Sequence, residues 1–141
     1  MEHRIARIVL MVLEFLVALG AISGGIALAT DIIRFPREWL QGTPFSDYTI
    51  PGAGLAILVG GSALCAALSV FIRRKWATFL PVMAGFLMAA YEVVHVELFD
   101  HLPWFYAGFF LLGLAAFSLA TYLWLAEYPD RSSSTRQHSP L

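Results

Sequence analysis

Four long apolar stretches dominate the pattern of hydrophobic and polar positions. They run over about residues 5–30, 53–72, 76–97 and 102–126. Each can cross a hydrocarbon core of about 30 Å as a helix, which takes about 20 residues. The stretches lack the alternation of barrel strands and are rich in Ala, Gly and Leu, so helices must satisfy their backbone hydrogen bonds. We predict an all-α fold, an integral membrane four-helix bundle over residues 1–127.

Composition agrees with this class. Hydrophobic residues make up 59% of the chain and charged residues 13%, and the mean hydropathy is +0.72, which leaves too few polar groups to cover a soluble domain. The net charge of -1 lacks the positive excess that nucleic-acid binding needs, so we expect membrane lipids and no nucleic acid as partners. Residues 128–141 are rich in Ser and charged side chains, which predicts a disordered tail.

The first apolar stretch has an alternative interpretation. Arg4 and Arg7 precede the first stretch and Ala27-Leu28-Ala29 resembles a cleavage site, as in a secretory signal. An apolar run well beyond 7 to 15 residues, interrupted by Glu14, favours a retained helix instead.

Cys65 has no partner cysteine in the chain, so we predict a small buried side chain.

The basic residues predict the orientation. Both ends of the chain and the loop between the second and third stretches share one side of a four-span protein. That side holds seven of the nine basic residues, namely Arg4, Arg7, Arg73, Arg74, Lys75, Arg131 and Arg136. Because basic loops stay inside, the amino and carboxyl termini are predicted to be cytoplasmic.

The first outer loop, from about Asp31 to Ile50, is too long for a plain connector. Phe35, Trp39 and Leu40 fall on one side of a short helix that would begin at Pro36. This pattern is typical of an interfacial helix that lies flat on the membrane as a lid. A disordered loop is the alternative.

Ionisable residues gather at the outer end of the third stretch. They are Glu92, His95, Glu97, Asp100 and His101. At 100° per residue, Glu92 and His95 share one face, whereas Glu97 and His101 point almost the opposite way. We predict that Glu92 and His95 form a buried pair facing the bundle interior, because water is scarce at their depth. Glu97, Asp100 and His101 are predicted to be interfacial.

Three roles remain open for Glu92 and His95: a structural polar network, a proton-carrying or substrate-binding pair, and a metal site. A network would recruit Arg34 or Arg37 from the loop above, because an arginine fork binds a carboxylate through two hydrogen bonds. A di-iron site would need a second such motif. Glu14, the other interior carboxyl, lies about 10 Å lower by helical rise. We therefore assign no metal and no cofactor. We expect Glu14 to be protonated and to donate a hydrogen bond to a backbone carbonyl, a hydroxyl or an amide.

Small residues indicate how the helices pack. Their patterns are Gly20-x-x-x-Gly24, Ala21-x-x-x-Gly25 and Ala56-x-x-x-Gly60. Such spacing lets helix backbones approach closely, so we predict contact between the first and second stretches, with dimerisation as the alternative use.

The segment QGTPFSDYTIPGAGLAILVGG, from Gln41 to Gly61, resembles a loop-plus-helix pattern of a family of small four-span bacterial membrane proteins. The resemblance implies a four-helix layout in the bacterial inner (plasma) membrane and carries no activity. In layout alone, the chain is also similar to the sterol-isomerase-like and DoxX-like membrane families.

These observations lead to two hypotheses for function. The first is a non-catalytic binding role, or association with a membrane protein partner or a second copy of the chain. The alternative is an intramembrane enzyme or proton-coupled carrier for a lipid-like or small hydrophobic substrate. In it, Glu92 is the acid or base, His95 its partner, and Arg34 or Arg37 holds an anionic group. An apolar pocket that reaches Glu92 would favour the alternative.

Overall fold

The structure, a computed structural model, describes residues 2–72, 78–98 and 104–136, with side chains for 4–72, 78–98 and 107–126. Its elements are the α-helices α1 (Glu2–Ala29), α2 (Thr49–Gly54), α3 (Ser62–Ile72), α4 (Phe79–Leu98) and α5 (Trp104–Arg136), the 3-10 helix η1 (Arg37–Leu40) and the π-helix η2 (Leu55–Gly61). The described residues contain no strand, which confirms the all-α prediction. Four helices are long and apolar enough to cross a membrane: Arg4–Ala29, Thr49–Ile72, Phe79–Leu98 and Ala107–Ala126.

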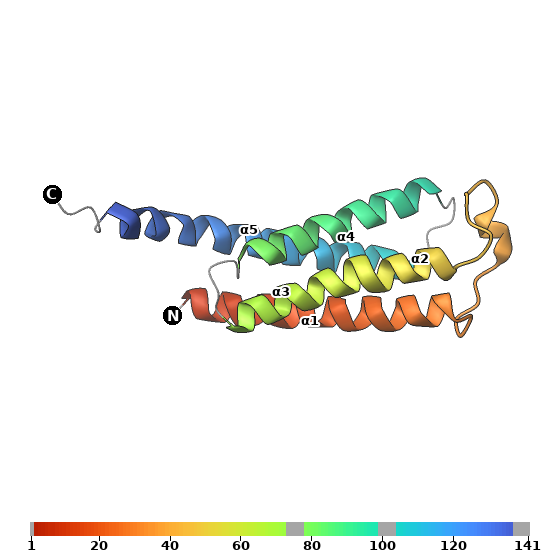
Figure 1. The fold of residues 1–141 in the computed structure, drawn as a ribbon, viewed down its shortest axis with the longest axis horizontal. Coiled ribbons are helices and arrows are strands. Elements are labelled where there is room, and N and C mark those ends of the chain that lie inside the picture. Colours follow the sequence, from red (N-terminus) through yellow and green to blue (C-terminus); the bar gives the residue numbers. More distant parts are fainter. Residues whose placement is uncertain (1, 73–77, 99–103, 137–141) are drawn as a thin grey trace.

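The helices form an up-and-down bundle (Figure 1). The segments α2, η2 and α3 follow one another without a break and form one continuous second helix. This second helix and α5 both pack against α1, and both also pack against α4. The loop that follows α1 and contains η1 lies at one end of the bundle, and α1 begins at the opposite end (Figure 1).

Proline residues mark where two of the helices begin. Pro81 is the third residue of α4 and Pro51 the third residue of α2. In the first turn the missing N–H of proline is harmless, because that donor has no partner within the helix. Pro81 therefore does not interrupt α4. The second helix begins at Thr49, four residues before the predicted start at 53.

Small side chains bring α1 and the second helix into close contact. A Cβ atom added at Gly25 would lie 2.5 Å from the backbone oxygen of Gly52, and one added at Gly52 would lie 2.6 Å from that of Gly25. Farther along, a Cβ at Gly60 would meet the Ile22 side chain at 2.5 Å. The predicted contact between these two helices is confirmed.

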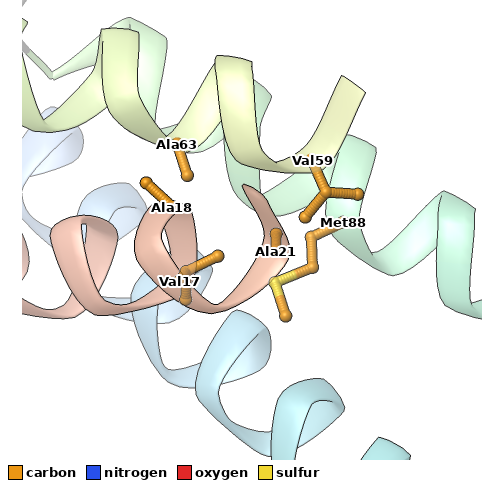
Figure 2. Packing of buried hydrophobic residues seen from close by; sticks show 6 residues of the cluster. All are labelled: Val17, Ala18, Ala21, Val59, Ala63 and Met88. Atoms are coloured by element: carbon orange, nitrogen blue, oxygen red, sulfur yellow. The ribbon is translucent and has the colours of Figure 1, made fainter. Parts of the chain in front are cut away.

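The buried core lies along the bundle axis in three clusters. The central cluster joins α1, the second helix and α4 (Figure 2) through Val17, Ala18, Ala21, Val59, Ala63 and Met88. A second contains Leu10, Val70, Ala116, Ala120 and Leu123. The third, at the loop end, contains Leu28, Leu40 and Tyr48. Alanine is frequent in the first two clusters, so the helices approach closely with few large side chains between them.

Two parts of the chain differ from the sequence interpretation. Cys65 is exposed on α3, so its predicted burial is wrong; it lies on the outer side of a helix that is apolar all round. The backbone of α5 continues to Arg136, into the segment 128–141 for which the sequence predicts a disordered tail. Residues 137–141 lie outside the described residues.

Candidate functional site

The two halves of the ionisable group on α4 have different surroundings. Glu92 is 4% exposed and His95 is 7% exposed, whereas Glu97 is exposed. Glu92 and His95 are therefore both buried in the bundle, and the position of Glu97 at a membrane interface remains a prediction. Asp100 and His101 lie outside the described residues.

Tyr91 anchors this part of α4 to the start of the second helix. Its hydroxyl donates a hydrogen bond of 2.9 Å to the backbone oxygen of Pro51. Its ring stacks on the His95 ring, with centroids 6.0 Å apart. The sequence analysis overlooked Tyr91; the available signal was an aromatic residue four positions before His95, on the same helical face.

An apolar cavity reaches Glu92. Its volume is about 100 Å³, and it is partly open. Among the described residues it is lined by Gly20, Gly24, Leu28, Ile33, Phe35, Leu55, Glu92 and Phe109. Every long helix contributes to this wall, and Glu92 is its single ionisable side chain among the described residues. His95 is absent from that lining, so the buried pair does not present two titratable groups to the cavity.

Two glycines on α1 shape the cavity in different ways. A Cβ atom at Gly20 would lie 2.7 Å from the ring of Phe109 on α5, whereas one at Gly24 would meet nothing within 4 Å. The first glycine therefore lets Phe109 approach α1, and the second leaves the space open. Gly20 and Gly24 therefore face α5 and the cavity, whereas Gly25 on the same helix faces the second helix.

Residues of the first loop pack together at this end of the bundle. Leu40 in η1 is buried and packs with Leu28 and Tyr48. The Phe35 ring stacks on Trp39 at 5.5 Å and meets Tyr48 edge-on at 5.9 Å. The Tyr48 hydroxyl donates a 2.9 Å hydrogen bond to the backbone oxygen of Pro36, and burial raises the pKa of this phenol.

The loop arginines do not contact Glu92 in the described part of the chain. Arg34 Nε donates to the backbone oxygen of Asp31 at 3.3 Å, and Arg37 acts electrostatically on Asp47. Both arginines are exposed, and a polar hollow of about 400 Å³ is lined by Asp31, Arg34, Phe35, Arg37, Asp47 and Tyr48. The expected recruitment of an arginine to Glu92 is therefore not seen among the described residues.

Asp47 is held in place by the start of the second helix. Its Oδ1 accepts a 2.9 Å hydrogen bond from the Thr49 backbone N–H. This hydrogen bond, with lesser help from the Thr49 hydroxyl and the charge of Arg37, lowers the pKa of Asp47 below its ordinary value. A lowered pKa in the folded state stabilises the fold above the ordinary value, and this contribution decreases as the pH falls through the folded-state pKa.

Glu14 is a separate interior carboxyl. It is 2% exposed, and its Oε1 has no hydrogen-bond partner within the described chain. The expected hydrogen bond to a carbonyl, hydroxyl or amide is not seen for this oxygen. Glu14 also does not line the cavity at Glu92, and the described residues contain no group of three or more His, Cys, Asp or Glu side chains placed to hold a metal ion.

Comparisons with protein-family models, curated proteins and solved structures find no match to this chain. The family resemblance of residues 41–61 therefore remains a prediction.

Proposed function

We propose that this protein is an integral membrane protein that binds a lipid-like amphiphile in the cavity at Glu92. The observation that carries the proposal is an apolar cavity, lined in part by Ile33 and Phe35 of the first loop, with one carboxyl group in its described wall. Such a site suits a ligand with an apolar part and one hydroxyl or ester group, because the carboxyl orients the ligand by a hydrogen bond while the walls bury its apolar surface.

The outer surface of the bundle supports insertion into a bilayer. Large apolar side chains project outward along all the long helices; Ile57 is 70% exposed and Phe71 is 72% exposed. Contiguous apolar surface of this extent is unfavourable in water and favourable against lipid chains. We infer the bacterial inner membrane as the setting, with both termini cytoplasmic, from the distribution of basic residues and from the resemblance of residues 41–61.

The cavity volume indicates how the ligand would sit. Pockets that enclose a whole drug-sized ligand measure about 300 to 1,000 Å³, and this cavity measures about 100 Å³. At about 30 Å³ per water-sized group, the cavity holds only a short part of a molecule. The remainder would extend along the outer apolar surface or under the loop, as the chains of a membrane lipid can.

Binding is favoured over catalysis by the placement of the buried pair. A general acid or base must come within hydrogen-bond reach of the reacting atoms. Glu92 meets this requirement, but His95, its expected partner, packs against Tyr91 and is absent from the cavity lining. An enzyme or proton-coupled carrier remains the competing proposal, because the cavity does reach Glu92.

A cavity-filling variant tests the proposal. Gly24→Leu should fit sterically, because a Cβ at this position meets nothing within 4 Å, and its side chain should occupy the cavity. Gly61→Leu is the matched control, since Gly61 also has free space and does not line the cavity. Each protein would be purified from bilayers of phosphatidylethanolamine and phosphatidylglycerol and analysed by native mass spectrometry.

The expected result is one lipid retained by the unmodified protein and by Gly61→Leu, and little or none by Gly24→Leu. Equal lipid retention by all three proteins would contradict the proposal. Chemical conversion of the retained lipid that is abolished by Glu92→Gln would replace binding by the enzymatic alternative.

A further inference from the structure

We propose that the polar hollow of the first loop binds the headgroup of a zwitterionic phospholipid, with the phosphate on Arg34 and Arg37 and the ammonium group near Asp31 and Asp47. This inference rests on the proposed function and deepens it, because it names the chemical class of the amphiphile that the cavity holds. The cavity at Glu92 and the hollow would then bind two parts of one molecule.

The two spaces are neighbours in the structure. Phe35 lines both the apolar cavity and the polar hollow. Of the two residues that precede Phe35, Ile33 lines the cavity and Arg34 lines the hollow. A short piece of the loop therefore forms a wall that is apolar towards the bundle and charged towards the outer end. An amphiphile that passes the Phe35 ring can place its apolar part on one side and its headgroup on the other.

Two of the charged side chains of the hollow, Arg34 and Asp47, are held by hydrogen bonds with nearby backbone atoms before any ligand binds. Arg34 Nε donates to the Asp31 backbone oxygen, and this leaves the two terminal guanidinium nitrogens of Arg34 without a hydrogen bond to the described residues. Asp31 itself has a φ of 55°, in the left-handed region that non-glycine residues seldom adopt. Asp47 is oriented by the Thr49 N–H. Such local contacts reduce the entropy lost when a ligand orders the site.

The balance of charge selects the type of headgroup. Two cations and two anions line the hollow, so its formal charge is zero. A purely anionic headgroup would be attracted by the arginines and repelled by the aspartates. A purely cationic headgroup would be attracted by the aspartates and repelled by the arginines. A zwitterion satisfies both pairs, because phosphate forms charge-assisted hydrogen bonds with guanidinium groups and an ammonium group does so with carboxylates.

The volumes of the two spaces agree with this placement of the headgroup in the hollow and the apolar part in the cavity. The polar hollow measures about 400 Å³ and the apolar cavity about 100 Å³. Only the larger space falls within the range of about 300 to 1,000 Å³ that is typical of pockets for drug-sized ligands, so only it has room for a complete headgroup. The smaller one suits the ester region or the first part of a chain, next to the Glu92 carboxyl.

The test measures headgroup preference with matched lipids. The full-length protein would be placed in bilayers of equal parts phosphatidylethanolamine and phosphatidylglycerol with identical chains, and the retained lipid identified by native mass spectrometry. The unmodified protein should retain phosphatidylethanolamine in preference. Arg34→Gln and Arg37→Gln should each lower total retention roughly tenfold, the effect of losing one charged hydrogen bond.

The acidic residues should shift the preference instead. Asp47→Asn keeps an oxygen that can accept from Thr49 but loses the charge, so it should weaken phosphatidylethanolamine binding and strengthen phosphatidylglycerol binding. Asp31→Asn should act in the same direction. Glu38→Gln is the control, because Glu38 is exposed in the same loop and does not line the hollow.

The outcomes separate this inference from the proposed function. A preference for phosphatidylglycerol in the unmodified protein would overturn the headgroup site. Unchanged total retention in both arginine variants, or an unchanged lipid ratio in both aspartate variants, would also overturn it. If Gly24→Leu still lowered total retention in that case, the amphiphile-binding cavity would stand without the headgroup site. If Gly24→Leu had no effect, the cavity proposal would fail whatever the headgroup preference.

Discussion

Gly24 and Gly25 on α1 should respond in opposite ways to the same substitution. Both change from glycine to alanine, so both gain the helix propensity of alanine, about 0.8 to 1 kcal/mol in a helix interior. Their surroundings differ. A Cβ at Gly24 meets nothing within 4 Å, so Gly24→Ala should stabilise the fold by up to about 1 kcal/mol.

At Gly25, the new methyl group meets backbone atoms that cannot rotate away. It would lie 2.5 Å from the Gly52 oxygen and 2.7 Å from the Ala56 nitrogen. The second helix must therefore move outward, and overpacking of this kind costs about 1 to 3 kcal/mol. Further loss follows along the contact, because a gap of 0.5 to 1 Å removes about a quarter to a half of each dispersion contact. After subtracting the propensity gain, Gly25→Ala should destabilise the fold by about 1 to 2 kcal/mol.

The assay is reversible unfolding in mixed detergent micelles with increasing dodecyl sulfate, followed by circular dichroism. The two variants should differ by about 2 to 3 kcal/mol in unfolding free energy. Gly52→Ala should resemble Gly25→Ala, and combining these two changes should cost less than their sum, because the first already separates the helices. Equal stability of Gly24→Ala and Gly25→Ala would refute the reasoning from close helix contact.

Three further predictions concern carboxyl groups and topology. Glu14→Gln should change the unfolding free energy by less than about 1 kcal/mol, because no ion pair is lost; a loss of several kcal/mol would indicate an ionised, paired group. Glu92→Gln should have a similarly small effect on stability but should reduce lipid retention. Glu97→Ala, at the exposed outer position, should change stability by about 1 kcal/mol or less and leave lipid retention unchanged. Equal effects of both changes on lipid retention would contradict the separation of Glu92 from Glu97. In a variant without the native cysteine, labelling from outside the cell should modify a cysteine introduced at Ser46 and spare one at Ser133, and the reverse result would invert the orientation.

Much of the fold could be predicted from local features of the sequence. The length of each apolar run specified a helix long enough to cross a membrane, because helices satisfy their own backbone hydrogen bonds. The angle of 100° per residue separated Glu92 and His95 from Glu97, since a straight helix cannot turn both groups inward. These properties depend on residues close together in the chain.

Only the tertiary structure decided which apolar residues face the core and which loop residues meet. Cys65 lies outward, because the interior and the lipid-facing surface of such a bundle are both apolar and the sequence pattern hardly distinguishes them. The loop arginines line a hollow together with acidic residues of their own loop. The Tyr91 hydroxyl donates a hydrogen bond to the backbone oxygen of Pro51, 40 residues away. The cavity at Glu92 depends on the distances between helices, which follow from how their small side chains pack together.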